Sequence, residues 1–139
     1  MEDLTPPLAP LVLIVDDDPD FVYLLGAALT RRGAVIESTT SAFGLVSRVA
    51  GITAQRRPDV VVLDCGLPAL SGTSALSLLA KNPKAAEVPV VLVSAAPPDD
   101  VQMRLSAHPH ARFLPKDGHF NSLAETVLAQ ATQAMEKPR

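Results

Sequence analysis

The sequence predicts an α/β fold in which helices cover both faces of a doubly wound, five-stranded parallel sheet. Two observations carry this prediction. Short apolar runs without polar interruptions recur along the chain, as is typical of parallel strands buried on both faces. The segments between them carry apolar residues at helical spacing. The expected strands span residues 11–15, 34–37, 60–64, 90–93 and 111–115.

The predicted domain organisation is simple. Five alternations of strand and helix, without an internal repeat, favour a single domain in a chain of 139 residues. We assign the domain to residues 11–135 and the C-terminal end to residues 136–139. Residues 1–10 carry three prolines and no periodicity, so we expect a flexible N-terminal tail. Whether the chain stands alone or was cut from a longer protein stays open.

The first two expected helices have clear ends. Asp18 is placed to cap a helix that begins at Pro19 and is closed by Gly33, a residue that tolerates a left-handed conformation. A second helix is expected over residues 41–50, ended by Gly51. The apolar face of the first helix comprises Phe21, Leu24, Leu25, Ala28 and Leu29. The expected inward-facing side chains of the second are Phe43, Val46 and Val49.

The last three expected helices differ in how clearly the sequence predicts them. Ser71 is placed to cap the third helix, and Asn82 and Pro83 end it. The fourth helix, over residues 97–108, has a thin apolar stripe, so we expect it to be mobile or to await a partner. The fifth is expected over residues 121–135. Its apolar side comprises Phe120, Leu123, Val127, Ala131 and Ala134.

Composition and charge exclude several classes of protein. The formal net charge is -3 and the basic runs are arginine pairs, at residues 31–32 and 56–57, so we expect no electrostatic footprint for nucleic acid. No apolar run approaches the roughly 18 residues of a membrane span, and the acidic N-terminus is unlike a secretory signal. The single cysteine, Cys65, excludes an internal disulfide. We therefore expect a soluble, cytoplasmic protein.

Polar residues lie at the carboxyl ends of four expected strands. Asp16 and Asp17 follow the first strand, Asp64 ends the third, and Ser94 and Lys116 follow the fourth and fifth. Ligands of such sheets bind outside these strand ends, so we expect one shared pocket. Unit charges about 4 Å apart repel by roughly 4 kcal/mol at an effective dielectric constant of 20, so three carboxylates here need a counterion. The all-oxygen ligand set suits Mg²⁺.

This set of side chains favours phosphoryl transfer. An aspartate can act as a nucleophile toward phosphorus and form an aspartyl phosphate. The metal ion, the Lys116 ammonium group and the Ser94 hydroxyl would neutralise charge on the phosphoryl oxygens. Plainer interpretations compete, since Asp16 and Asp17 could only cap a helix and Asp64 could be an ordinary acid at a strand end. Their convergence on one sheet edge favours the site.

Four motifs follow one another along the chain. They are LIVDD at residues 13–17, VLD at 62–64 followed by Pro68, VSA at 93–95 and FLPK at 113–116. In this combination the chain resembles the receiver domain of two-component response regulators, over about residues 11–135. The resemblance implies a flavodoxin-like fold with strand order 2-1-3-4-5 and a role in phosphorelay signal transduction.

The resemblance assigns roles to the acids. Asp64 would be the phosphoacceptor. Asp17 and Asp64 would ligate Mg²⁺ together with the carbonyl group of Gly66, and Asp16 would help through a water molecule. The domain would assist its own phosphorylation and dephosphorylation without being an enzyme toward a separate substrate.

The remaining motif residues would bind and sense the phosphoryl group. The Ser94 hydroxyl and the backbone N–H of Ala95 would bind the phosphoryl oxygens, and Lys116 would pair with them. In the family, a hydroxyl at the Ser94 position and an aromatic ring at the Phe113 position are coupled as a two-state switch.

The resemblance also implies protein partners. A sensor histidine kinase or a histidine phosphotransfer protein would donate the phosphoryl group. A downstream protein would read the change on the fourth helix, fifth strand and fifth helix. A phosphorylation-dependent homodimer is a further expectation, whereas direct binding of nucleic acid or membrane is not expected. The cognate kinase, the signal and the downstream partner stay open.

One position departs from the family pattern. The family usually has proline after the lysine, joined by a cis bond, whereas Asp117 follows Lys116 here. A cis bond before another residue costs about 2.5 to 4 kcal/mol, so we expect a trans peptide and a re-aimed loop. Asp117 could also compete for the ammonium group, which would make phosphorylation slower or weaker. The alternative function is a degenerate receiver-like interaction module that works without phosphorylation. A small-molecule phosphatase is disfavoured, because Gly66 stands where its second acid would be needed.

Overall fold

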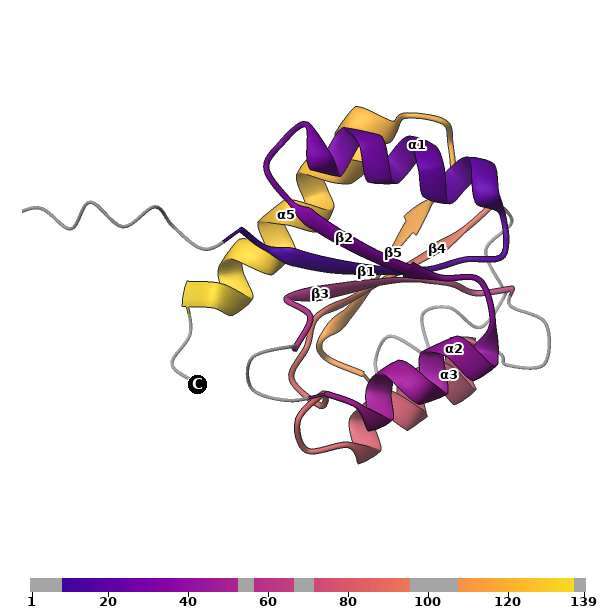
Figure 1. Cartoon of the computed structure of the whole chain (residues 1–139), viewed down its shortest axis with the longest axis vertical. Coiled ribbons are helices and arrows are strands. Elements are labelled where there is room, and N and C mark those ends of the chain that lie inside the picture. Colours follow the sequence, from indigo (N-terminus) through magenta and orange to yellow (C-terminus); the bar gives the residue numbers. More distant parts are fainter. Residues whose placement is uncertain (1–8, 53–56, 67–71, 96–107, 137–139) are drawn as a thin grey trace, which may run out of the picture.

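Five parallel strands form one sheet in the order β2-β1-β3-β4-β5, which confirms the expected fold class (Figure 1). The computed structural model describes residues 9–52, 57–66, 72–95 and 108–136. Strand β2 begins one residue later and ends two residues later than expected, because all five of its residues pair with β1. The strands are β1 (Leu11–Val15), β2 (Val35–Thr39), β3 (Val60–Asp64), β4 (Val90–Ser94) and β5 (Ala111–Pro115).

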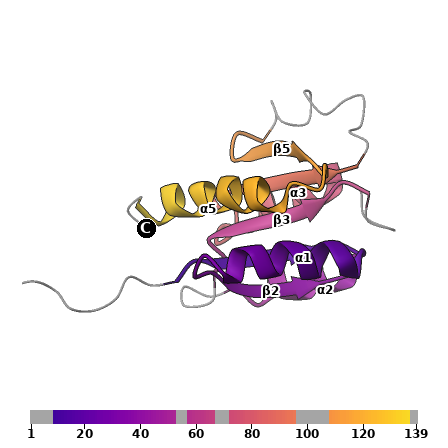
Figure 2. The same ribbon diagram turned by 90° about the horizontal axis from the view of Figure 1, so that it is seen from above.

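Helices cover both faces of the sheet. One face carries α1 (Pro19–Thr30) and α5 (Phe120–Glu136), and the other carries α2 (Ala42–Ala50) and α3 (Gly72–Lys81) (Figure 1). Figure 2, turned by 90°, shows α1 and α5 running along the same face. This doubly wound arrangement places the carboxyl ends of all five strands at one edge of the domain.

Two apolar clusters fill the spaces between the sheet and its helices. Leu13 and Leu63 pack with residues of α2 and α3, whereas Ile14 and Val62 pack with residues of α1 and α5. This division follows from the alternation of side chains along each strand. All five residues of β3 are buried. The continuous apolar run in the sequence therefore reflects burial of the central strand on both faces.

The ends of α1 lie where the sequence predicts them. Asp18 Oδ1 accepts the backbone N–H groups of Asp20 at 3.0 Å and of Phe21 at 3.4 Å. These bonds satisfy donors that the first turn of a helix leaves unpaired. Gly33 closes the segment with a φ of 91°, in the left-handed region that glycine adopts without strain. Of the expected apolar face, Leu24 differs because its side chain is largely exposed.

The orientation of α2 corrects one prediction. Phe43 is 79% exposed and Val46 is 45% exposed, whereas Leu45 between them is buried. The helix adopts this orientation because Gly44 packs against the end of β2, where a Cβ atom at Gly44 would lie 1.7 Å from Thr39 Oγ1. Each residue turns the helix by about 100°, so this contact carries Phe43 and Val46 away from the core.

Other predicted boundaries agree with the structure to within two residues. Val49 is buried as expected, α3 ends at Lys81, and α5 begins at Phe120. No helix within the described ranges is both long and apolar enough to cross a membrane. Some predictions concern parts of the chain outside the described residues, namely most of the tail, Pro68, the Ser71 cap and nearly all of the fourth helix.

Candidate functional site

Three carboxylates meet at the carboxyl ends of β1 and β3. Asp16 and Asp17 follow β1, and Asp64 is the last residue of β3, which pairs with β1. One oxygen from each of the three side chains lies within 4.8 Å of the other two. Asp16 and Asp64 are buried, whereas Asp17 is exposed. The structure therefore brings together the acids that the sequence places at one sheet edge, and we call them the acidic cluster.

Lys116 supplies a positive charge to the acidic cluster. Its Nζ atom lies 2.7 Å from Asp16 Oδ2 and 3.7 Å from Asp64 Oδ1. The backbone N–H of Lys116 donates to the carbonyl oxygen of Ser94 at 3.0 Å, so the residue that follows β5 is tied to the end of β4. The ammonium group is thus shared between two carboxylates and lies closer to Asp16.

Backbone N–H groups hold the two buried carboxylates in place. Asp18 N–H donates to Asp16 Oδ1 at 2.9 Å, and Gly66 N–H donates to Asp64 Oδ1 at 3.2 Å. Asp16 Oδ2 is fully buried and makes no hydrogen bond of regular geometry within the described part of the chain; the nearby Lys116 ammonium balances its charge. A buried oxygen with spare acceptor capacity fits a cation or an ordered water molecule.

Burial and neighbouring charges set the protonation of the Asp16 and Lys116 pair. Burial raises the pKa of Asp16 above its ordinary value, and the nearby Lys116 ammonium group and a hydrogen bond from Asp18 N–H offset this only in part. Burial also opposes the charge on Lys116, but the carboxylates of Asp16 and Asp64 outweigh it and raise the pKa of Lys116. Three acids face one ammonium group, so the cluster carries excess negative charge that a divalent cation would balance.

The donor set of the acidic cluster fits Mg²⁺. Asp16, Asp17 and Asp64 are the described residues whose oxygens lie close enough to hold an ion together. Mg²⁺ prefers oxygen ligands and keeps several water molecules, so one or two direct carboxylates suffice. Gly66, two residues after Asp64, is exposed, and its backbone N–H donates to Asp64 Oδ1.

The other predicted site residues lie on β4 and β5 and directly after β4. Ser94 ends β4 and is half-buried, and the exposed Ala95 lines a cavity of about 280 Å³ together with Lys116. Phe113 is half-buried on β5 and packs against the core on the α2 and α3 side. Its register partner is Leu92, two residues before Ser94. Because side chains alternate along strands, Ser94 and Phe113 belong to the same side of the sheet.

Asp117 turns away from the acidic cluster. Asp117 Oδ1 accepts the backbone N–H of His119 at 3.0 Å, and Asp117 Oδ2 lies 3.3 Å from His119 Nδ1. The His119 N–H bond holds the pKa of Asp117 below its usual range. Lys116 pairs with Asp16 and Asp64 and forms no ion pair with Asp117, and no peptide bond within the described ranges is cis. The predicted trans peptide is confirmed, whereas the predicted competition for the ammonium group is wrong.

The sequence alone does not single out Phe21 as part of the site. Lys116 Nζ lies 4.5 Å from the centroid of the Phe21 ring. A second ring, that of Phe120, lies 5.8 Å from Phe21 between centroids, at an interplanar angle of 50°. In the sequence, Phe21 belongs to the apolar face of a helix. Its place in the first turn after the acids is the one signal that could have indicated the contact.

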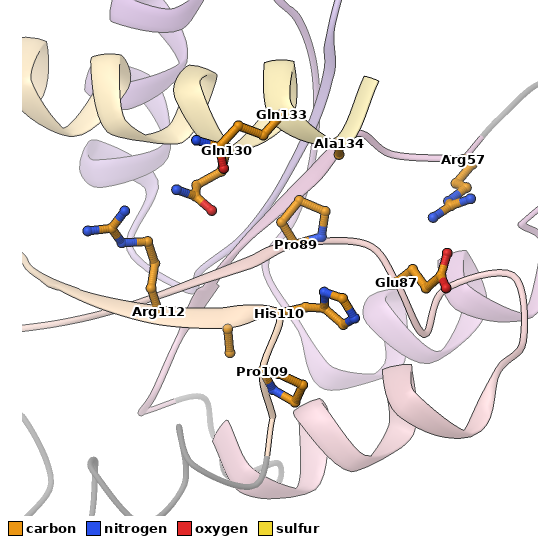
Figure 3. Close-up of a pocket in the computed structure, with 10 residues that line it drawn as sticks. Arg57, Glu87, Pro89, Pro109, His110, Arg112, Gln130, Gln133 and Ala134 are labelled. Atoms are coloured by element: carbon orange, nitrogen blue, oxygen red, sulfur yellow. The ribbon is translucent and has the colours of Figure 1, made fainter. Parts of the chain in front are cut away.

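A larger cavity, of about 760 Å³, lies at the opposite end of the strands. Figure 3 shows Pro89 before β4, His110 before β5 and Gln130 on α5 around this cavity. No member of the acidic cluster lines it. The largest of the described cavities and the acidic cluster therefore lie at opposite ends of the strands.

Comparison with known proteins identifies the family. A model of the response regulator receiver domain matches residues 12–128. The chain belongs to this family.

Two curated relatives match part of the chain. Protein PilH of Pseudomonas aeruginosa is 33% identical to this receiver domain over 84 residues, which are 60% of this chain and 65% of PilH. The transcriptional regulatory protein KdpE of Mycobacterium tuberculosis is 46% identical over 67 residues, which are 48% of this chain and 27% of KdpE. The receiver domain thus spans less than two thirds of either relative.

Solved structures share the receiver fold. The receiver domain of the sensor histidine kinase PA1611 from P. aeruginosa, with a magnesium ion coordinated in its active site cleft, matches with a TM-score of 0.75 at 22% identity. That match covers 90% of this chain and 99% of the other. The chemotaxis response regulator CheY4 of Vibrio cholerae matches with a TM-score of 0.73 at 18% identity, over 91% and 99% of the two chains. At these identities the likeness concerns the fold.

Proposed function

We propose that this receiver domain accepts a phosphoryl group on Asp64 in a Mg²⁺-dependent reaction, and that the modification switches partner binding. The donor is a sensor histidine kinase or a histidine phosphotransfer protein. One observation carries the proposal: Asp64 ends the central strand with Asp16 and Asp17 within 4.8 Å and the Lys116 ammonium 3.7 Å away. A nucleophilic carboxylate, candidate metal ligands and a cation for the phosphoryl oxygens therefore occupy one place.

The proposed transfer is a displacement at phosphorus. A carboxylate oxygen of Asp64 attacks the phosphorus atom of the donor and forms the new P–O bond of an aspartyl phosphate. The P–N bond of a phosphohistidine, or the P–O bond of acetyl phosphate, breaks, and its electron pair stays with the leaving group. The Lys116 ammonium, now shared between two carboxylates, pairs with an oxygen of the arriving group.

Asp17 and Asp64, with the Gly66 carbonyl group, would hold Mg²⁺, and Asp16 would contribute through water. Bound Mg²⁺ would supply charge neutralisation on the phosphoryl oxygens. The excess negative charge of the acidic cluster and the spare acceptor capacity of buried Asp16 Oδ2 support this assignment. The chain itself supplies the nucleophile, and it acts as a phosphoacceptor rather than as an enzyme toward a separate substrate.

The proposed switch involves Ser94, Ala95 and Phe113. The Ser94 hydroxyl and the Ala95 N–H bind phosphoryl oxygens, and the movement of Ser94 is coupled to the ring of Phe113. Two facts support the coupling: the two residues lie on neighbouring strands, offset by two positions, and both side chains belong to the same side of the sheet.

The proposed reader surface comprises β5 and α5, together with the fourth helix predicted from the sequence. Phosphorylation of Asp64 controls the binding of a downstream protein to this surface. Phosphorylation would likewise control the formation of a homodimer. We place the reaction in the cytoplasm, where histidine kinases and phosphotransfer proteins present their phosphoryl groups. Strand β5 supports the assignment because it is the last strand of the sheet and has one unpaired edge within the described residues.

The decisive experiment is intact-mass measurement after incubation with acetyl phosphate, with and without Mg²⁺. The parent should gain one phosphoryl group only with Mg²⁺, and Asp64→Ala should gain none. Asp59→Asn is the matched control, because Asp59 is a buried aspartate outside the acidic cluster, next to the other end of β3. It should be labelled like the parent.

Labelling of Asp64→Ala to the parental extent would overturn the assignment. A folded parent that gains nothing would also overturn it, and would favour an interaction module that works without phosphorylation. The orientation of Asp117 toward His119 removes one reason to expect that second result.

A further inference from the structure

Lys116 has a third neighbour besides its two carboxylates. Its Nζ atom lies 4.5 Å from the centroid of the Phe21 ring, within the distance at which a cation over an aromatic face is attracted by the ring quadrupole. The carboxylates of Asp16 and Asp64 attract the same ammonium group. Its position is therefore set by two acids and one ring.

The two carboxylates alone do not fix the position of the Lys116 ammonium group. Asp16 Oδ2 lies at 2.7 Å and Asp64 Oδ1 at 3.7 Å, so attraction by Asp16 draws Lys116 away from the proposed phosphoacceptor. A lysine side chain has four rotatable bonds, and its charge is not directional. A neighbour that keeps Lys116 within reach of both acids would therefore affect transfer.

Phe21 is held rigidly enough to be that neighbour. It is 5% exposed and lies in the first turn of α1, where its N–H donates to the Asp18 cap at 3.4 Å. The ring of Phe120, the first residue of α5, packs on it with a centroid distance of 5.8 Å and a tilt of 50°. Tilted ring pairs of this kind are favourable packing arrangements. Helix α1 and helix α5 together fix the ring.

We propose that Phe21 is a positioning residue for Lys116: its ring face holds the ammonium group between Asp16 and Asp64, where it can pair with a phosphoryl group on Asp64. This inference rests on the proposed function of Asp64 and Lys116. It adds a residue outside the four sequence motifs, supplied by α1 rather than by a strand end.

The ring face, and not only its bulk, is what the proposal requires. Leucine and methionine at position 21 would fill much of the same space without an aromatic face. Tyrosine would keep the face, and its hydroxyl group could enter the cavity of about 280 Å³ that Phe21 lines. Comparison of these three replacements separates the attraction of Lys116 by the ring quadrupole from the effect of apolar packing.

The test combines phosphorylation rates with an NMR signal from Lys116. Initial rates with acetyl phosphate and Mg²⁺ are measured for the parent, Phe21→Leu, Phe21→Met and Phe21→Tyr. We expect Phe21→Leu and Phe21→Met to react about three- to tenfold more slowly, and Phe21→Tyr to react like the parent. The methylene protons beside Lys116 Nζ should show an upfield ring-current shift in the parent and in Phe21→Tyr, and should lose it in the other two variants.

Leu25→Val is the control for loss of packing, since Leu25 is fully buried one turn further along α1. It should lower stability without changing the phosphorylation rate. Parental rates in Phe21→Leu and Phe21→Met would overturn this inference and leave the proposed function standing. An equal loss of rate in Leu25→Val or Phe21→Tyr would overturn it too, because general packing would then explain the effect. A parent that is not phosphorylated would overturn the proposed function and this inference with it.

Discussion

Leu11 and Asp59 are joined by two hydrogen bonds at the amino ends of β1 and β3. Leu11 N–H donates to Asp59 Oδ2 at 2.8 Å, and Asp59 N–H donates to the Leu11 carbonyl at 2.8 Å. Asp59 is 8% exposed, so its carboxylate is largely removed from water. Its hydrogen bond to the N–H of Leu11 holds the start of β1. The pair fixes the alignment of the two strands whose other ends bear Asp16 and Asp64.

This relationship predicts a structural role for Asp59. Asp59→Ala should lower the free energy of unfolding by about 1 to 3 kcal/mol, because it leaves the partly buried N–H of Leu11 without that acceptor. Asp59→Asn keeps an acceptor oxygen and should lose much less. Urea denaturation of both variants measures the difference. Equal stability of Asp59→Ala and the parent would contradict the prediction.

Gly44 should tolerate no side chain. A Cβ atom there would lie 1.7 Å from Thr39 Oγ1 and 2.9 Å from Thr39 Cβ, so Gly44→Ala must shift the Thr39 side chain or α2 and should cost about 1 to 3 kcal/mol. Gly26→Ala is the matched control in α1, where the added atom meets Ile36 Cγ2 at an ordinary 3.9 Å. That change should stabilise the protein by roughly 0.5 to 1 kcal/mol, as alanine does in helices.

Thermal denaturation of the two glycine variants provides the comparison. The melting temperature should fall in Gly44→Ala and rise in Gly26→Ala. The double variant Gly44→Ala with Thr39→Ala should recover part of the loss, because the nearest clashing atom is removed. No recovery would show that the backbone, and not the Thr39 side chain, limits the contact.

Mg²⁺ should stabilise the folded receiver domain. Binding to the folded state alone adds about 2.7 kcal/mol at a free Mg²⁺ concentration near one hundred times Kd. Asp17→Asn and Asp64→Asn should each lose most of this effect, whereas Asp59→Asn should keep it, since it lies away from the acidic cluster. Melting curves with Mg²⁺ and with a chelator measure the shift. An undiminished shift in Asp17→Asn would remove Asp17 from the ligand set.

The raised pKa of Asp16 predicts how stability changes with pH in the absence of Mg²⁺. Because burial raises the folded pKa above the ordinary 3.8, the folded state keeps a proton that the unfolded chain has already lost. The stability contributed by this group is fully present below pH 3.8 and is lost as the pH rises through the folded pKa. Asp16→Asn has no such loss, so it should gain stability relative to the parent as the pH rises from below 3.8 toward neutral.

Urea denaturation across that range tests the prediction about Asp16. The pKa of Lys116 is raised above 10.5, so its stability contribution is lost only above that pH and does not enter the comparison. A stability difference between parent and Asp16→Asn that stays constant across the range would contradict the assigned cause.

The strands could be predicted because the sequence pattern coincides with burial. β3 is an uninterrupted apolar run and is buried at every residue, and its carboxyl end fixes Asp64. The convergence of Asp16, Asp64 and Lys116 follows from a rule of parallel sheets and does not require side-chain detail. The same rule predicted where the candidate site lies, whereas the order of the strands was expected from the resemblance to receiver domains.

The orientation of α2 and the surroundings of Lys116 could not be predicted in this way. Phe43, Val46 and Leu45 are all apolar, so their pattern does not decide which of them faces the core, and the close approach of Gly44 to Thr39 appears only in the structure. The Phe21 ring on α1 lies beside Lys116, which follows β5, and this is a relation between segments that are distant in the sequence. The Asp117 carboxylate accepts a hydrogen bond from the backbone N–H of His119, two residues away, and does not pair with Lys116.

The strands differ in burial from the centre of the sheet to its edge. β3 is buried throughout, whereas β5 alternates between half-buried and exposed residues. Close packing makes the middle of the sheet stiff, and the outer strand is compliant because fewer contacts resist its displacement. Displacement of an outer strand, β2 or β5, therefore meets less resistance than displacement of β3, so this sheet yields first at its edges.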